Sequence, residues 1–184
     1  MMFYPKYLGI RDGNYLIAFP DSHNMDERGF IVTGATASTA LMLLFLLSPF
    51  INQSGSFIGL DGSPAIIDHG WNGLKGIGYT IGDILCHQES DRCFILNGNQ
   101  MPICIRDTGL LLGLMIGLFA CIPLGTNIGD GKFLLIGIAL VAVTGIEWMA
   151  ESFMGNMPAI RMISGIIAGI GAALILGWLL YREK

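Results

Sequence analysis

Four segments of this 184-residue chain are long and apolar enough to cross a bilayer as helices: 31–50, 107–124, 132–150 and 160–181. A helix needs about 20 residues to span the ~30 Å of hydrocarbon in a membrane. Only 13% of the residues are charged and 53% are hydrophobic, whereas a soluble domain carries about 25% charged residues. We therefore expect an all-α integral membrane protein with four transmembrane helices.

The residues outside these segments predict an N-terminal arm and one lateral helix. Residues 1–30 alternate polar and apolar side chains and lack the apolar core of a signal peptide, so we assign them to an arm that precedes a membrane domain over 31–184. Five polar or ionisable side chains interrupt the mixed segment near 66–86: Asp68, His69, Asn72, Lys75 and Asp83. They make a free-standing span costly. We predict an amphipathic helix near 66–86 that lies in the interface or packs on the bundle, and a fifth span is the alternative.

Small residues recur every four positions in two of the predicted spans. One series is Gly109, Gly113 and Gly117, and the other is Gly165, Gly169, Ala173 and Gly177. Small residues at this spacing line one helix face and let two backbones approach closely. This glycine-zipper pattern indicates tight helix–helix packing.

An internal similarity links the starts of two spans. The stretches MPICIRDTGLLLG (101–113) and MPAIRMISGIIAG (157–169) align without gaps at Met-Pro, at a hydroxyl residue and at Gly-x-x-x-Gly. A helix-hairpin repeat would explain the match, and so would the limited set of residues that begin helices. Two spans separate the two Met-Pro stretches, so both must lie on the same face of the membrane.

Most of the remaining chemistry lies in the segment before the second span. Four residues of the kinds that zinc prefers fall within it: Cys86, His87, Cys93 and Cys104. Asp107 would add an oxygen ligand at the start of the next helix. No C-x-x-C pair is present, so the spacing is not that of a zinc finger.

A disulfide clasp is the alternative interpretation of the same cysteines. Cys86 and Cys104 would close a loop of about twenty residues and stabilise it by ~3 kcal/mol on the chain-entropy model, provided that the loop faces an oxidising compartment. Cys93 and Cys121 would then be left over, and Cys121 lies inside an apolar span as a small packing residue.

Two carboxylates share a helix face near the end of the third span. Glu147 and Glu151 are four residues apart, and two like charges at this spacing disfavour joint ionisation unless a cation or an arginine neutralises them. Pairing with Arg161 is one interpretation, and metal or proton handling is the other. Arg106 is expected to pair in the same way with a nearby carboxylate, Asp107 or Asp83.

Residues 76–113 resemble a widespread group of small prokaryotic membrane proteins known as domain of unknown function 2085. Its pattern is C-H-Q, then an Arg-Ser-Phe-like element, then G-x-Q-x-P-x-C-x-R-C-T-G. The matching residues are Cys86-His87-Gln88, Arg92-Cys93-Phe94, Gly98 to Pro102, Cys104, Arg106 and Thr108-Gly109. A looser similarity covers the last two spans at Glu147, Glu151, Arg161 and Ser164-Gly165. The resemblance implies a prokaryotic cell membrane as the location, and it transfers no activity.

Two positions depart from the family pattern. Asp107 stands where the family has the second cysteine of C-x-R-C, and Cys93 stands where the family usually has serine. If the motif is a metal site, this chain exchanges one thiolate for a carboxylate. The exchange favours a harder or more weakly held ion, or an open catalytic-type site. If the motif is a disulfide, the pair Cys86 and Cys104 is unaffected.

These observations favour a metal site at one membrane face, with zinc as the preferred divalent ion, used for metal transport or for metal-assisted hydrolysis by a bound water. The expected ligands are Cys86, His87, Cys104, Asp107, Glu147 and Glu151. The residues expected to support them or to contact a substrate are Gln88, Arg92, Gln100, Arg106 and Arg161.

Two other functions fit the same sequence. One is a non-catalytic membrane scaffold with a disulfide between Cys86 and Cys104. The other is a small-solute transporter whose repeats rock against each other, and four spans are few for that unless the chain forms a homo-oligomer. The net charge of -4 without a basic run argues against a nucleic-acid partner, so the lipid bilayer is the expected partner.

Overall fold

The computed structural model describes residues 10–11, 14–15, 22–61, 73–155 and 157–182. Within these ranges, four helices are long and apolar enough to span a membrane, and their mean hydropathy lies between 2.0 and 2.2. They are α1 (Ser22–Ile51), α3 (Ile105–Leu124), α4 (Gly131–Met154) and α5 (Pro158–Tyr181). The predicted all-α membrane fold with four spans is thus confirmed.

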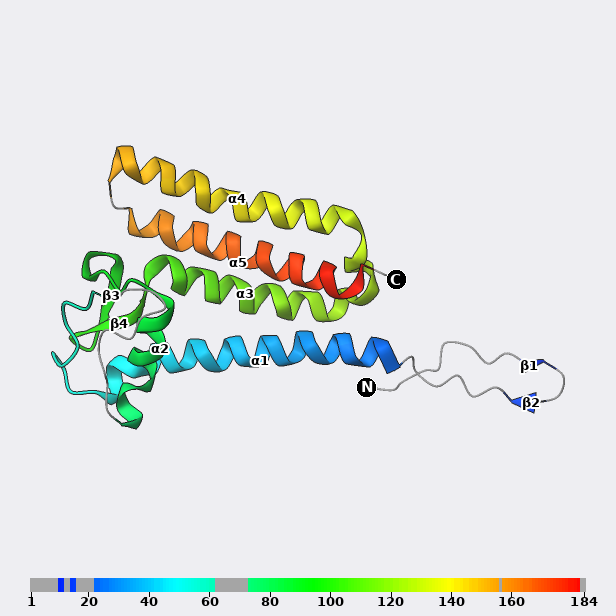
Figure 1. Cartoon of the computed structure of the whole chain (residues 1–184), viewed down its shortest axis with the longest axis horizontal. Coiled ribbons are helices and arrows are strands. Elements are labelled where there is room, and N and C mark those ends of the chain that lie inside the picture. Colours follow the sequence, from blue (N-terminus) through cyan, green and yellow to red (C-terminus); the bar gives the residue numbers. More distant parts are fainter. Residues whose placement is uncertain (1–9, 12–13, 16–21, 62–72, 156, 183–184) are drawn as a thin grey trace.

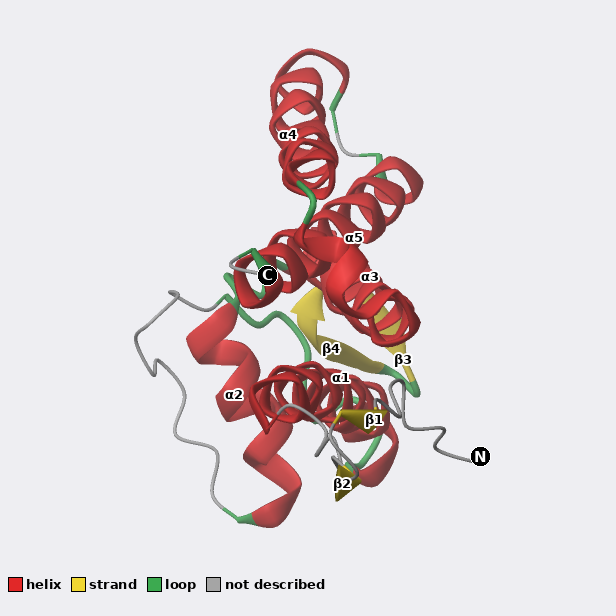
Figure 2. Ribbon diagram, turned by 90° about the vertical axis from the view of Figure 1, so that its right-hand side faces the viewer, coloured by secondary structure: helices red, strands yellow, loops and turns green. Residues whose placement is uncertain are grey.

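The four helices lie side by side in the order α4, α5, α3, α1 (Figure 1). Helices α3 and α5 begin at the same end of the bundle, and α1 and α4 run in the opposite direction. The Met-Pro stretches that precede α3 and begin α5 therefore share one face, as predicted. Figure 2 looks along the bundle and shows α4 on the side farthest from α1.

The first helix begins earlier than the apolar pattern indicated. Its backbone is helical from Ser22, within the segment assigned to the arm, although its membrane-compatible part begins at Glu27. An apolar run marks where a helix can enter hydrocarbon, not where its backbone hydrogen bonds start. In the arm, β1 (Ile10–Arg11) pairs antiparallel with β2 (Asn14–Tyr15).

The two series of small residues pack against each other where α3 crosses α5. A methyl group added at Gly113 would collide with the backbone of Ile166, and one added at Gly169 would collide with the backbone of Leu110. Gly109 and Gly165 face each other at the start of the crossing. The predicted tight packing is confirmed, and it brings the N-terminal ends of α3 and α5 together.

A small cap covers this end of the bundle. It consists of a 3-10 turn η1 (Leu74–Gly76), helix α2 (Ile77–Leu85), a second turn η2 (Ser90–Arg92) and a hairpin of β3 (Cys93–Leu96) and β4 (Asn99–Cys104). The α2 helix has nine residues and is too short to cross a bilayer. It forms the last part of the lateral helix predicted near 66–86, of which residues 66–72 lie outside the described ranges.

The segment that carries the cysteines forms a β-hairpin, which was not predicted from the sequence. Asn97 and Gly98 form its two-residue turn with φ of 50° and 70°, the left-handed backbone that a type I′ turn requires. The strands place Cys93 opposite Cys104, with an irregularity between Cys93 and Ile95. Cys104 is the last residue of β4 and directly precedes the first residue of α3.

Buried side-chain amides of β4 bind the cap to the segment 52–61, which follows α1. Asn99 accepts from the Phe57 N–H at 3.0 Å, and the Gln100 side chain accepts from the Leu60 N–H at 3.1 Å. The Phe57 ring stacks on Tyr79 of α2 with centroids 3.8 Å apart. The hairpin, α2 and the segment after α1 therefore form one packed unit, which positions the cysteines.

Candidate functional site

Three potential metal ligands meet where the cap joins α3. Cys86 directly follows α2, Cys104 is the N-cap residue of α3, and Asp107 lies in the first turn of that helix. One ligand atom of each residue lies within 4.8 Å of the other two. We call these three residues the thiol–carboxylate cluster. The cluster is confined to one end of the bundle, at the membrane face.

Backbone amides are directed at both sulfurs of the cluster. Cys86 Sγ accepts from the Cys104 N–H at 3.2 Å and from the Gln88 N–H at 3.5 Å. Cys104 Sγ accepts from the Asp107 N–H at 3.4 Å and donates to Asp107 Oδ2 at 3.1 Å. The extended backbone of Cys86 and Cys104 at two helix ends produces this arrangement. Such donors stabilise negative charge on sulfur, as outer hydrogen bonds do around metal ligands.

The two thiols of the cluster differ in acidity. The pKa of Cys104 is lowered, chiefly because the Cys86 thiol donates a hydrogen bond to its sulfur, with help from the backbone N–H of Asp107. The same hydrogen bond, together with burial, raises the pKa of Cys86. Burial raises the pKa of Cys93, opposite Cys104 in the hairpin, to about 12. In the metal-free protein, Cys104 is therefore the most nucleophilic of these three thiols.

This difference predicts the order in which the cysteines react. In metal-free protein, iodoacetamide is expected to modify Cys104 before Cys93 and Cys121, which are 8% and 0% exposed. The rate should fall as the pH drops through the lowered pKa of Cys104, because protonation removes the thiolate nucleophile. Peptide mass spectrometry after a short pulse at several pH values measures this order. Early labelling of Cys93 would contradict it, and Cys104→Ser should abolish the fast label.

The expected ligand His87 lies outside the cluster, and so does Cys93, the other residue of this segment of a kind that zinc prefers. Among the described residues, the cluster contains no histidine. His87 is exposed and lines a cavity of about 120 Å³ that also borders Cys86, Cys104 and Asp107. We call this cavity the small cavity, and it gives the cluster one open side. Cys93, by contrast, is buried in the hairpin.

The predicted carboxylates of the third span are bound by arginines. Arg106 donates from Nε and Nη2 to the two carboxylate oxygens of Glu147, at 3.1 and 3.2 Å, and from Nη2 to Glu151 at 3.1 Å. Arg161 donates to Glu151 from Nη2 at 2.9 Å and also from Nε. Ser164 donates to Glu147 at 3.3 Å. The structure therefore brings Glu147 and Glu151 to Arg106 and Arg161, and not into the thiol–carboxylate cluster.

We call Arg106, Glu147, Glu151 and Arg161 the arginine–glutamate network. Its two positive and two negative charges compensate one another, which a membrane-embedded site requires. The ion pair of Arg161 with Glu151 is the one expected from the sequence. Arg106 pairs with these two glutamates of α4, and neither Asp107 nor Asp83 is its partner. The network ties α4, which packs chiefly on α5, to the first turn of α3.

The glutamines of the family pattern support the loop that carries the cluster. Gln88 is fully buried and donates to the carbonyls of Pro102 at 2.8 Å and Tyr79 at 3.4 Å. The amide of Gln100 donates to the Gln88 carbonyl. Gly82 of α2 leaves room for the hydrogen bond from Gln88 to Pro102, because a Cβ at Gly82 would lie 2.8 Å from Gln88 Nε2. These two residues hold the backbone around Cys86.

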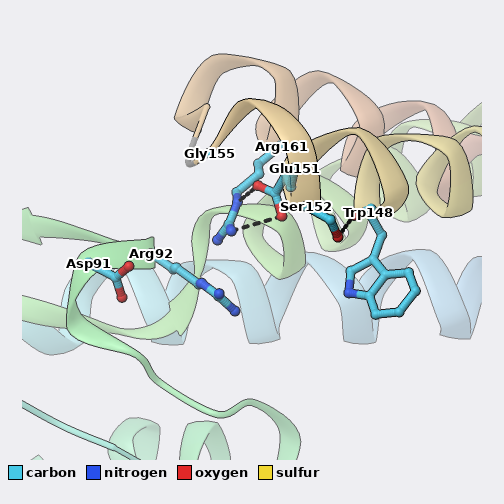
Figure 3. Close-up of a pocket in the computed structure, with 7 residues that line it drawn as sticks. All are labelled: Asp91, Arg92, Trp148, Glu151, Ser152, Gly155 and Arg161. Carbon is cyan, nitrogen blue, oxygen red and sulfur yellow. Dashed lines mark hydrogen bonds and ion pairs between the residues drawn. The ribbon is translucent and has the colours of Figure 1, made fainter.

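A second, larger cavity lies between the cap and the ends of α4 and α5. Its volume is about 320 Å³, and Figure 3 shows the residues that line it: Asp91, Arg92, Trp148, Glu151, Ser152, Gly155 and Arg161. Arg92 and Arg161 also line the small cavity. Asp91, Trp148 and Ser152 carry no signal in the sequence that points to this cavity, because only the fold brings the cap next to the α4–α5 turn. We call this space the large cavity.

Comparison with known proteins finds one similar family and two similar archaeal proteins. A family model described as "Predicted membrane protein (DUF2085)" matches residues 86–175. An uncharacterized protein of Methanocaldococcus jannaschii is 27% identical over 135 residues, which cover 69% of this chain and 80% of that protein. An uncharacterized protein of Methanothermobacter thermautotrophicus is 26% identical over 93 residues, covering 50% of this chain and 83% of that protein. No solved structure matches. Over residues 86–175, from the thiol–carboxylate cluster into α5, the chain is therefore similar to the DUF2085 family of predicted membrane proteins.

Proposed function

We propose that the thiol–carboxylate cluster binds one divalent transition metal ion, preferably zinc, at the membrane face. The observation that carries this proposal is the approach of Cys86 Sγ, Cys104 Sγ and an Asp107 oxygen to within 4.8 Å of one another. Ligand sulfurs on a tetrahedral zinc with Zn–S of about 2.3 Å lie ~3.8 Å apart. A small contraction of the cluster would therefore suffice.

The surroundings support thiolate ligation. The three N–H groups directed at the two sulfurs would stabilise them after the loss of their protons. Two thiolates and one carboxylate would outweigh the charge of a divalent ion by one, and the guanidinium groups of Arg92, Arg106 and Arg161 border the small cavity. His87, or a water, would complete a four-ligand shell from the open side.

The position of the cluster favours metal-assisted chemistry over metal transport. Transport sites are commonly found near the middle of the bilayer, whereas this cluster lies at the end of the bundle. The carboxylates that would continue an ion path into the membrane, Glu147 and Glu151, are held by arginines. Three protein ligands and an open position are typical of sites in which zinc activates a water. Arg92 and Arg161 would contact a substrate bound at that position.

Cobalt(II) titration of metal-free, reduced protein in detergent tests the proposal. Cobalt bound by cysteine gives a thiolate charge-transfer absorption, so the wild type should show this band at one equivalent. Cys86→Ala and Cys104→Ala should each reduce the band and weaken binding by about tenfold or more. Asp107→Cys, which restores the family residue, should intensify the band.

Cys121→Ala is the matched control, since Cys121 is buried in the α3–α5 contact, away from the cluster. It should titrate like the wild type. A wild type without the band, or an equal loss in Cys121→Ala, would contradict the metal site. All four cysteines are free in the structure; if Cys86 and Cys104 instead resist alkylation until reduced, the scaffold with a disulfide clasp is the better account.

A further inference from the structure

The large cavity contains charged groups of both signs next to the lipid-facing side of α4. Arg92 approaches from the cap, and Arg161 and Glu151 lie below the α4–α5 turn (Figure 3). Arg161 is 3% exposed, although it lines both cavities. Two arginines and two carboxylates, Glu151 and Asp91, give the lining no net charge. A ligand that carries one positive and one negative group would match it best.

Both arginines keep hydrogen-bond donors for such a ligand. Arg161 uses Nε and Nη2 on Glu151, and Arg92 uses Nε on Glu89 at 2.8 Å. No described residue accepts from Nη1 of Arg161 or from either Nη of Arg92. Two guanidinium groups on opposite sides of one space are suited to a phosphate, which accepts several charge-assisted hydrogen bonds. The ring of Trp148 and the hydroxyl oxygen of Ser152, which lie together at one end of the cavity (Figure 3), are suited to an ammonium group.

The cavity lies at the end of the candidate span of α4, where lipid headgroups are expected. Trp148 is 65% exposed in the last turns of α4, and tryptophan is enriched at the membrane–water interface. Phe153, on the last turn, is 88% exposed. Trp148 and Val141, which lie two turns apart on one face of α4 and are both exposed, form an apolar surface that leads from the cavity toward the middle of the span. Acyl chains would lie along it while their headgroup occupied the cavity.

We propose that the large cavity binds the headgroup of a zwitterionic phospholipid with a primary ammonium group, as in phosphatidylethanolamine. Arg92 and Arg161 hold its phosphate, and Ser152 and Trp148, at one end of the cavity, contact its ammonium. The site does not require the metal. It adjoins the thiol–carboxylate cluster through Arg92 and Arg161, which line both cavities.

Native mass spectrometry of the full chain in detergent tests this site. Phosphatidylethanolamine and phosphatidylglycerol are added at equal concentration, and the bound lipid is counted after activation. The protein should retain phosphatidylethanolamine over the anionic lipid by about tenfold, the effect of one charge-assisted hydrogen bond. Arg92→Ala should lower this retention by a similar factor. Its side chain is 45% exposed and lies outside the arginine–glutamate network, so the variant should fold.

Lys132→Ala is the matched control. Lys132 is an exposed cation at the other end of α4, paired with Asp130 at 2.9 Å, and its loss should leave lipid retention unchanged. Equal retention of the two lipids, or an Arg92→Ala variant that retains phosphatidylethanolamine like the wild type, would overturn the proposal. A dimer that retains no lipid would overturn it as well, because a second copy would then fill the cavity. Metal content, measured on the same samples, should not change in Arg92→Ala, so this test is separate from that of the metal site.

Discussion

Replacing Gly169 with alanine is expected to destabilise the protein by about 3 kcal/mol, the upper part of the range for overpacked contacts. A Cβ at this position would lie 2.5 Å from the backbone nitrogen of Leu114 and would collide with the carbonyl oxygen of Leu110. Backbone cannot rotate away as a side chain can, so α3 and α5 would have to separate. Thermal unfolding in detergent measures the effect, at about 2–4 °C of Tm per kcal/mol.

Gly145→Ala is the matched control for this prediction. Gly145 also lies inside a span, but beyond the backbone of its own helix no described atom lies within 4 Å of its added Cβ. Alanine favours helix over glycine by up to about 1 kcal/mol, so this variant should be as stable as the wild type or slightly more stable. An equal decrease of Tm in the two variants would show that the stability depends on the flexibility of glycine and not on the close approach of α3 and α5.

The second large effect is expected from Arg161→Met. Arg161 is 3% exposed, and its removal leaves Glu147 and Glu151 to share Arg106, with one buried negative charge uncompensated. Removing one partner of a buried ion pair lowers the free energy of unfolding by about 3–5 kcal/mol. The double variant Arg161→Met with Glu151→Gln removes both charges and should recover most of the loss. Thermal unfolding of the two variants in the same detergent provides the comparison.

The control for the network is Lys132→Met, which removes an ion pair on the exposed surface. Exposed pairs contribute little to stability, so no measurable change in Tm is expected. If Arg161→Met alone were as stable as the double variant, the charges of the arginine–glutamate network would not be coupled. The attachment of α4 to α3 through this network would then be unsupported.

The sequence predicted the parts of the fold that depend on local composition. Each span is a continuous apolar run, because lipid imposes this on any helix that crosses it. The spacing of Gly109, Gly113, Gly165 and Gly169 predicted close packing, because the period of the helix places these residues on one face. The cysteines at the start of α3 were recognised for a similar reason: Cys86 and Cys104 flank helix ends that the apolar pattern locates.

Of the parts that were missed, the hairpin is local, and the others depend on contacts between distant segments. The hairpin had a local signal, Asn97-Gly98 between apolar stretches, which is typical of a type I′ turn. The partner of Arg106 had none, because Glu147 and Glu151 reach it only through the packing of α4 on α5 and of α5 on α3. The large cavity is formed in the same way, since Arg92 and Trp148 belong to elements far apart in the chain.

The most direct test of the central claim is the metal content of protein purified without added metal. Elemental analysis should find close to one equivalent of zinc, or of another transition metal, in the wild type and in Cys121→Ala. Cys86→Ala and Cys104→Ala should both lose it. Metal-free wild type in which Cys86 and Cys104 react with thiol reagents only after reduction would contradict the account and identify the thiol–carboxylate cluster as the site of a disulfide clasp.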